Sequence, residues 1–242
     1  MPFPVNLILF EAAETERPLP RADPRAVHLL RVLRRREGDT FDAGLIDGPR
    51  GRGTLAAIGP DALTLAFSWG AAPPPPDPLT VIIGMPRPQT ARDILRDATA
   101  LGVGAMHFVT ADKSEPGYAR SALWTSGEWR RQLIAGAAQA FATRLPAVSR
   151  GASLVETVGG LPDGIARVAL DNYEAGGSLA RLDLAGARSV ALALGAERGW
   201  SAAERAVLRG AGFTLAHLGP RVLRTETAVT AAVTLIRAKL NL

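Results

Sequence analysis

The longer, C-terminal part of the chain alternates between short apolar runs and segments with one apolar face. The apolar runs predict strands buried on both sides of a sheet. They cover residues 79–84, 105–109, 165–170, 189–194 and 213–216. The amphipathic segments predict helices over residues 90–101, from about 123 to 141, from 201 onward and after 224. This alternation predicts an α/β fold with a largely parallel sheet and helices on both faces.

The first 70 residues have a different pattern. Short strands are expected around residues 40–46, 53–58 and 62–67, with turns at Asp47-Gly48 and Gly59-Pro60, so a small β-barrel is predicted. Residues 71–78 read Ala-Ala-Pro-Pro-Pro-Pro-Asp-Pro and predict a stiff linker. We therefore expect a barrel domain at 1–70, a proline-rich linker at 71–78 and an α/β domain at 79–242.

Two glycine-bearing loops follow the last two apolar runs. The first is Gly195-Ala-Glu-Arg-Gly199, and Ser201-Ala-Ala-Glu204 after it forms a capping box that starts a helix. The second is Leu218-Gly-Pro-Arg-Val-Leu-Arg-Thr-Glu-Thr-Ala228, which leads into the last helix. Ligands of α/β proteins bind at the carboxyl ends of strands, where glycine lets the backbone approach them closely. These loops, together with Asn172, Tyr173 and Glu174 after another strand, predict one binding site.

The second loop, residues 218–228, resembles the signature of the bacterial 16S ribosomal RNA uridine-N3 methyltransferase family. That family belongs to the SPOUT superfamily, in which a C-terminal trefoil knot binds S-adenosylmethionine. The resemblance implies a knotted α/β domain, preceded by a barrel like the RNA-binding PUA domains. It also implies a homodimer that acts on ribosomal RNA or the small ribosomal subunit. We expect no metal, because the methyl transfer needs none, and no membrane partner.

The resemblance assigns roles to residues of both loops. The catalytic candidates are Arg221, Arg224 and Glu226, of which the arginines would stabilise charge on the uridine as its N3 proton leaves. The expected cofactor contacts are Leu170, Leu194, Gly195, Ala196, Glu197, Gly199, Leu218, Gly219, Val222, Leu223, Thr225 and Ala228.

The chain departs from the family pattern at two places. The first loop of the family usually reads Gly-Pro-Glu-Gly-Gly, and Arg198 here would be strained if that position required a positive φ. In the motif at the end of the family's long helix, Ala138, Ala140 and Ala142 replace glutamate, serine and arginine. An active methyltransferase and a non-catalytic or retargeted RNA-binding paralogue therefore both remain open.

Composition narrows the function classes. The net charge is +5, and an arginine-rich segment with a short predicted helix supplies candidate RNA contacts at Arg25, Arg31, Arg34, Arg35 and Arg36. The absence of cysteine excludes disulfides and thiolate metal sites, and the three dispersed histidines have no metal-site spacing. No apolar run is long enough to span a membrane and no signal peptide is evident, so a cytoplasmic location is expected.

A nucleotide-dependent oxidoreductase or hydrolase is a third possibility for glycine loops in an α/β sheet. Such enzymes usually carry Gly-x-x-x-x-Gly-Lys-Ser/Thr, or Gly-x-Gly-x-x-Gly after the first strand. Neither pattern occurs in this chain. The sequence therefore favours RNA methylation over this class.

Overall fold

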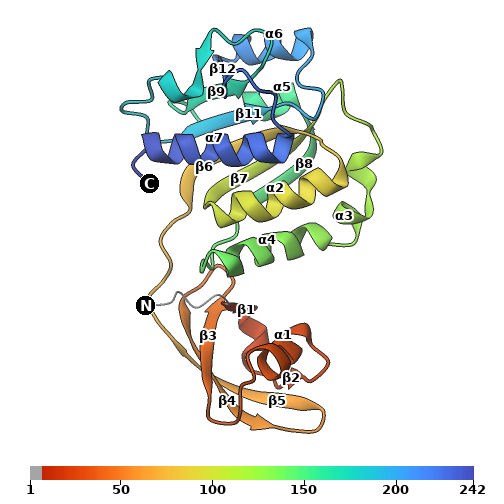
Figure 1. Ribbon diagram of the computed structural model, residues 1–242, viewed down its shortest axis with the longest axis vertical. Helices are drawn as coiled ribbons and strands as arrows, with labels where there is room; N and C mark the ends of the chain where they lie inside the picture. The colour runs from red at the N-terminus through yellow and green to blue at the C-terminus, as the bar shows by residue number, and fades with distance from the viewer. Residues whose placement is uncertain (1–6) are drawn as a thin grey trace. The chain divides into compact units, whose positions relative to one another are not determined.

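The computed structural model describes residues 7–242, which form two compact units (Figure 1). The first unit runs to Pro75 and also contains Ala137–Leu145. The second unit consists of Pro76–Gly136 and Pro146–Leu242. Strand β6 of the second unit begins at Asp77, so the last two residues of the proline-rich segment belong to a strand.

The first unit is built on a five-stranded sheet in the order β1-β3-β4-β5-β2. The strands expected in this part of the chain are confirmed as β3 (Thr40–Leu45), β4 (Arg50–Ile58) and β5 (Ala62–Trp69). The short strands β1 (Ile8–Phe10) and β2 (Leu19–Pro20) were not predicted. Phe10, Phe41 and Leu55 are fully buried against this sheet and form its core. The barrel itself stays a prediction.

The arginine-rich segment of the first unit contains α1 (Pro24–Val27) and a π-helical turn, η2 (His28–Val32). Arg25 does not fit the predicted role in RNA binding, because its guanidinium is engaged within the protein. It pairs with Glu14 at 2.8 Å and with Asp23 at 2.9 Å, and lies over the Phe10 ring. These contacts raise the pKa of Arg25 and lower those of both carboxylates. The other candidates, Arg31, Arg34, Arg35 and Arg36, are exposed.

Residues Ala137–Leu145 contact the hairpin between β3 and β4, although they are distant in sequence. The Thr143 hydroxyl donates to the Gly48 carbonyl at 2.6 Å, and the Asp47 amide donates to the Thr143 carbonyl at 2.8 Å. Arg50 donates to the Phe141 carbonyl at 3.0 Å. Thr143 is buried by this packing, so the segment is a structural part of the first unit.

The second unit contains a seven-stranded sheet in the order β10-β12-β9-β11-β6-β7-β8, and every neighbouring pair is parallel. The strands are β6 (Asp77–Gly84), β7 (Val103–Thr110), β8 (Ala147–Ser153), β9 (Ala166–Leu170), β10 (Gly177–Ser178), β11 (Val190–Leu194) and β12 (Thr214–His217). The largely parallel sheet expected from the apolar runs is confirmed. Strand β11 lies at its centre and all five of its residues are buried.

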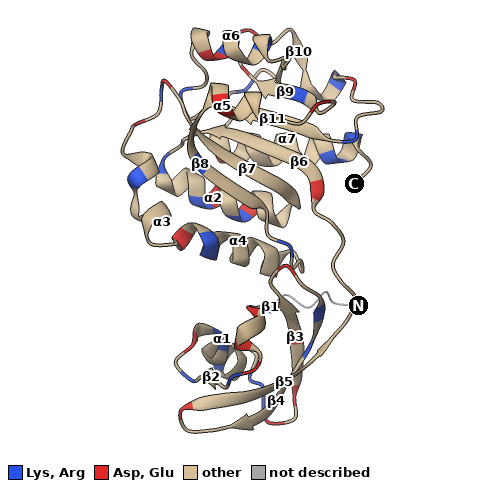
Figure 2. Ribbon diagram, turned by 180° about the vertical axis from the view of Figure 1, so that it is seen from behind, with Lys and Arg blue, Asp and Glu red and all other residues tan. Residues whose placement is uncertain are grey.

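Helices cover both faces of this sheet. Helices α2 (Pro88–Ala100) and α7 (Thr225–Lys239) lie on one face, in front in Figure 1. Helices α5 (Leu154–Gly159) and α6 (Ala202–Gly210) lie on the other face, seen in Figure 2. The buried face of α7 consists of Val229, Ala232, Val233 and Ile236, as its apolar stripe predicts.

The continuous helix expected from about residue 123 to 141 is wrong. The structure has a short helix, α3 (Ala122–Thr125), and then α4 (Glu128–Gln139). Gly127 separates them with φ +73°, a left-handed conformation that interrupts a helix. Trp124 of α3 is buried, with its ring edge-to-face against Phe108 at 4.9 Å between centroids.

No helix within residues 7–242 is both long and apolar enough to span a membrane.

Candidate active site

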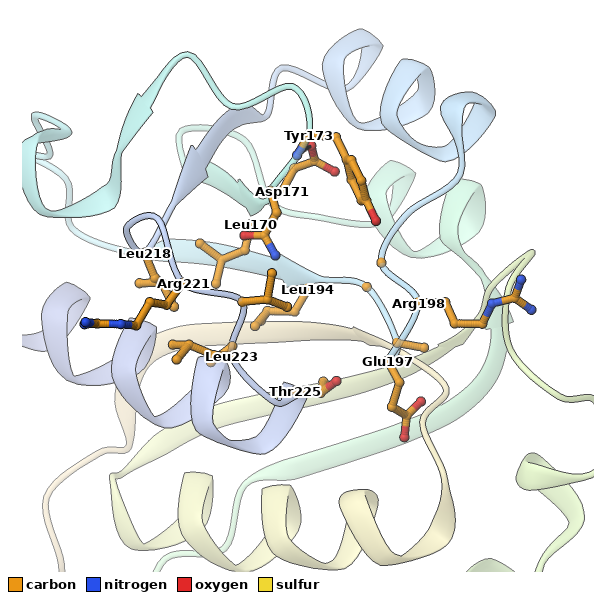
Figure 3. Close-up of a pocket in the computed structure, with 16 residues that line it drawn as sticks. Leu170, Asp171, Tyr173, Leu194, Glu197, Arg198, Leu218, Arg221, Leu223 and Thr225 are labelled. Carbon is orange, nitrogen blue, oxygen red and sulfur yellow. Dashed lines mark hydrogen bonds between the residues drawn. The ribbon is translucent and has the colours of Figure 1, made fainter.

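The carboxyl ends of β9, β11 and β12 open into one cavity of about 270 Å³ (Figure 3). The loop after β9, the first glycine loop and the second glycine loop form its walls. Leu170, Leu194, Leu218 and Leu223 come together near its centre, and Arg198 and Arg221 extend outward in opposite directions (Figure 3). The remaining lining residues are Asp171, Asn172, Tyr173, Gly195, Ala196, Glu197, Gly199, Val222, Thr225 and Ala228.

The structure places the predicted cofactor residues in this lining, with one exception. Gly219 instead lines a separate cavity next to His217, and its amide donates to His217 Nδ1 at 3.0 Å. Its φ is +116°, and a Cβ added there would meet no atom within 4 Å. Glycine at position 219 is therefore required by the backbone conformation, and a side chain there would not fill the first cavity.

The first glycine loop is held by close backbone packing. A Cβ on Gly195 would lie 2.6 Å from the Gly199 carbonyl carbon and 2.7 Å from the Trp200 amide nitrogen, so a side chain there requires the loop to move. The positive φ of this loop falls on Gly199, at +64°, and not on Arg198. The strain expected for arginine at position 198 is therefore absent.

Glu197 points from this loop toward the start of α2. Its Oε1 accepts from the Arg87 amide at 2.9 Å and from Arg87 Nε at 3.2 Å. Burial alone would raise the pKa of Glu197, but the hydrogen bonds from the Arg87 amide, its own amide, the Arg87 guanidinium and Thr90 together lower it. Glu197 is thus a carboxylate that fixes Arg87.

Hydrogen bonds and ion pairs connect the wall formed by residues 171–174 to α6. Asp171 is buried, and its Oδ1 accepts from the amides of Tyr173 at 2.8 Å and Glu174 at 2.6 Å. Arg205 donates to Glu174 at 2.7 Å and to the Trp200 carbonyl at 2.9 Å, and lies 3.4 Å from Asp171 Oδ2. Arg209 also pairs with Glu174. These hydrogen bonds and ion pairs hold residues 171–174 in place and pair the carboxylates of Asp171 and Glu174.

Tyr173 stands at the mouth of the cavity and is 75% exposed. The cations of Lys113 and Arg205 lie 5.9 and 5.7 Å from its ring centroid. Lys113 also donates to the carbonyls of Arg198 and Trp200, at 3.1 and 2.8 Å. It therefore ties the first glycine loop to the tyrosine.

A second cavity, of about 500 Å³, adjoins the first. The two share Glu197, Val222, Leu223 and Thr225, which lie between them. Two of the three catalytic candidates, Arg224 and Glu226, line the second cavity, and the third, Arg221, lines the first. The other residues of the second cavity are Arg87, Gln89, Thr90 and Asp93, all at the start of α2.

Sequence reasoning missed Arg87 and Asp171. Arg87 lies just before a predicted helix, and nothing local to it indicates that Glu197, distant in sequence, would bind it. Asp171 had a signal, because it is the first residue after a predicted strand whose end was assigned to the site. An Asp at that position commonly accepts from the following backbone amides.

The lining of the first cavity suits a nucleoside with a charged amino-acid tail. Leucine and alanine side chains supply apolar contact for a base and ribose, and the backbone at Gly195 can approach a ligand without a side chain between. Asp171, Asn172 and Glu197 supply polar groups at the edge. Within residues 7–242 no group of three or more His, Asp or Glu side chains could hold a metal ion.

Known proteins resemble this chain in both sequence and fold. The sequence model of the RNA methyltransferase domain family matches residues 73–237. A ribosomal RNA small subunit methyltransferase E from Treponema pallidum is 33% identical over 246 aligned residues, which cover 97% of this chain and 91% of that protein.

Two crystal structures resemble the fold over nearly the whole chain. A probable rRNA-methyltransferase from Porphyromonas gingivalis has a TM-score of 0.81 at 21% identity, with 98% of each chain covered. A ribosomal RNA small subunit methyltransferase E from Neisseria gonorrhoeae, bound to S-adenosylmethionine, has a TM-score of 0.78 at 20% identity, with 97% of this chain and 98% of that chain covered. At these identities the likeness concerns the fold.

Proposed function

Because this chain belongs to the RNA methyltransferase family, we propose that it is an S-adenosylmethionine-dependent ribosomal RNA methyltransferase. The observation that carries the proposal is the cavity at the carboxyl ends of β9, β11 and β12, closed by the two glycine loops within the family match. A methyltransferase needs such a nucleoside pocket beside a place for the accepting base. The second cavity provides that place.

We assign the first cavity to the cofactor. Leu170, Leu194, Leu218, Leu223 and Ala228 would contact the adenosine, and the backbone of residues 195–199 would approach it closely. S-adenosylmethionine supplies a methyl group bonded to a positively charged sulfur. The polar rim residues Asn172 and Glu197 would orient its amino-acid part.

We further propose that the accepted position is N3 of a uridine in 16S ribosomal RNA. This nitrogen is a poor nucleophile while it is protonated, so the protein must stabilise charge as the proton leaves. Arg224 can donate to the base and Glu226 can accept the proton, because both line the cavity next to the cofactor. Arg221 extends outward from the first cavity and is better placed to contact RNA than the reacting base.

Three structural features belong to the same proposal. The 218–224 segment would be part of a trefoil knot, which would explain why two loops distant in sequence form one pocket. The first unit would be a PUA-like barrel that presents Arg31, Arg34, Arg35 and Arg36 to phosphates. Two chains would form a homodimer, and light scattering at micromolar concentration should give twice the chain mass.

A non-catalytic or retargeted paralogue is the second candidate. It is favoured by Ala138, Ala140 and Ala142, which replace the polar residues found in the family motif. Arg198 no longer supports it, because that residue has no positive φ and extends away from the cavity.

Methyl transfer from tritiated S-adenosylmethionine to naked 16S ribosomal RNA and to small subunits separates the candidates. We expect incorporation into one of the two substrates, with N3-methyluridine as the labelled nucleoside after digestion. Calorimetry should show binding of S-adenosylmethionine. Binding of RNA without cofactor binding or incorporation would contradict the enzyme and favour the paralogue.

A further inference from the structure

The second cavity is lined by Thr225, whose hydroxyl pairs with no group of the described residues 7–242. Thr225 is only 8% exposed, yet it lines both cavities. Among the hydrogen bonds of residues 7–242, none involves the Thr225 side chain, and the N-cap Arg224 does not cap α7 with its own side chain. The hydroxyl is not one of the fully buried atoms that lack a partner, so a ligand or water in the cavity can reach it and pair with it.

Arg87 adds a second set of donors to this cavity. Glu197 accepts from the Arg87 amide and from Arg87 Nε, while the Arg87 side chain remains 64% exposed and lines the second cavity. Its terminal nitrogens carry no hydrogen bond to the described residues. Gln89 Oε1 accepts from Arg92 Nη1 at 3.4 Å, which leaves the side-chain NH₂ group of Gln89 as a further donor.

The charged groups that face this cavity divide into paired and unpaired ones. The cations are Arg87 and Arg224, and the carboxylates are Asp93, Glu197 and Glu226. Glu197 is paired with Arg87, and Asp93 with Arg96 at 3.0 Å. Glu226 has no ion pair within residues 7–242. The cavity therefore presents hydroxyl, guanidinium and amide donors around one available carboxylate.

We propose that this cavity binds the Watson–Crick edge of the target uracil, with Thr225 and Arg87 donating to its ring oxygens and Glu226 facing N3. The inference rests on the proposed function and adds the base subsite and two residues to it. The uracil edge consists of an N–H between two carbonyl oxygens, which matches donors placed around a carboxylate. Arg87 is a specificity residue positioned by Glu197.

This arrangement accounts for the charge that develops in the reaction. The N3 proton passes to Glu226 and then to water, and the remaining negative charge spreads over N3 and the two ring oxygens. The N3 lone pair forms the bond to the methyl carbon, while the carbon–sulfur electron pair returns to sulfur. Donors to the ring oxygens stabilise the anion before this transfer, so they lower the pKa of the bound N3–H.

The test compares RNA containing uridine with the same RNA containing 5-fluorouridine, whose N3 proton is more acidic. The variants are Arg87→Gln and, because it preserves shape in a buried position, Thr225→Val. Arg188→Gln is the matched control, since Arg188 is an exposed arginine of the same unit that lines neither cavity. Calorimetry with S-adenosylmethionine and thermal unfolding check that each variant is folded.

For Arg87→Gln we expect turnover on uridine RNA to fall roughly 100-fold. The loss on 5-fluorouridine RNA should be about tenfold smaller, because a more acidic base depends less on the donor. The rising limb of the rate–pH profile should move to higher pH, since removing a cation raises the pKa of N3–H. Thr225→Val should act in the same direction with a smaller loss, Arg87→Lys should restore part of the activity, and Arg188→Gln should behave as the unaltered protein.

Equal losses on both RNAs, with a higher KM for RNA and a weaker salt dependence, would identify a phosphate contact and overturn the proposal. Loss of cofactor affinity in step with turnover would assign Thr225 to the first cavity and would also overturn its role here. If the unaltered protein methylates neither RNA, the proposed function fails and this inference fails with it.

Discussion

The segments on the two sides of the cavities, residues 171–174 with α6 and residues 218–226, use their arginines in opposite ways. On the side of residues 171–174 and α6, Arg205 and Arg209 are bound to Glu174, and Arg205 also reaches Asp171 and the Trp200 carbonyl. On the side of residues 218–226, Arg221 and Arg224 have no hydrogen bond or ion pair to any residue within 7–242, and both are exposed. The arginines of α6 are paired within the protein, whereas those of residues 218–226 remain available to a ligand.

The difference gives a criterion, independent of relatives, for proposing which arginines bind a ligand. A paired guanidinium near a site fixes a wall, whereas an unpaired one at the mouth of a cavity can bind an anion. The first unit shows the same difference. Arg25 is paired with Glu14 and Asp23, whereas Arg34 is exposed.

The largest effect on cofactor binding is expected from a substitution in the first glycine loop. Gly195→Val should abolish binding of S-adenosylmethionine, because its Cβ would lie 2.6 Å from the backbone of Gly199 and displace the loop. Calorimetry measures the affinity, and circular dichroism should show that the fold persists. Gly210→Ala is the control, because a Cβ there meets nothing within 4 Å. Normal affinity in Gly195→Val would show that this loop does not form the cofactor site.

Arg224→Ala tests the open side. Turnover at saturating RNA should fall roughly 100-fold if the guanidinium stabilises developing charge on the base. Cofactor affinity should change little, since Arg224 lines the second cavity and not the first. A higher RNA requirement with intact turnover would instead make Arg224 a docking contact.

Arg205→Leu tests the paired arginines of α6 and should lower the free energy of unfolding. The change removes a bond to the Trp200 carbonyl and leaves the buried Asp171 without its cation, at a cost of about 1–3 kcal/mol. Chemical denaturation measures the free energy of unfolding. If Arg205→Leu matched the unaltered protein in stability but lost turnover, Arg205 would belong with the functional arginines.

Replacing Arg34, Arg35 and Arg36 together by Gln should weaken RNA binding and leave turnover at saturating RNA unchanged. The log–log slope of affinity against salt should flatten by up to about 0.9 for each lost duplex phosphate contact. Titrations of RNA at several salt concentrations provide the slope. Arg25 should not be added to this set, because its loss would destabilise the unit; an unchanged slope in the triple variant would remove this segment from the RNA surface.

The smallest effect concerns Glu197, whose pKa is lowered from 4.5. A lowered folded-state pKa contributes stability above the unfolded value, and this contribution is lost as the pH falls through the folded value. Thermal unfolding of the unaltered protein should therefore decline more steeply below about pH 4.5 than that of Glu197→Gln. Parallel curves would show that the bonds to Arg87 do not persist in solution.

The parallel sheet could be predicted because a strand buried on both faces is a continuous apolar run in the sequence. Leu170 and Leu194 are the last residues of two such runs, so their place at the carboxyl edge of the sheet could be predicted as well. The motif at residues 218–228 led to the walls of the cavity, since its spacing is specific. Contacts between residues distant in sequence could not be predicted from local patterns. Glu197 and Arg87 meet only because β6 and β11 are neighbours in the sheet, and Gly127 broke a helix that the apolar spacing alone would have continued.

The contribution of Ala137–Leu145 to the first unit bears on how the chain is made and divided. During synthesis, the hairpin of β3 and β4 leaves the ribosome before Thr143, so Gly48 and Asp47 wait for partners that emerge about one hundred residues later. No single cut separates the two units, because a fragment ending at Pro75 lacks this segment and the complementary fragment carries it without its acceptor. A fragment that keeps either unit intact must therefore keep Ala137–Leu145 together with the hairpin of β3 and β4.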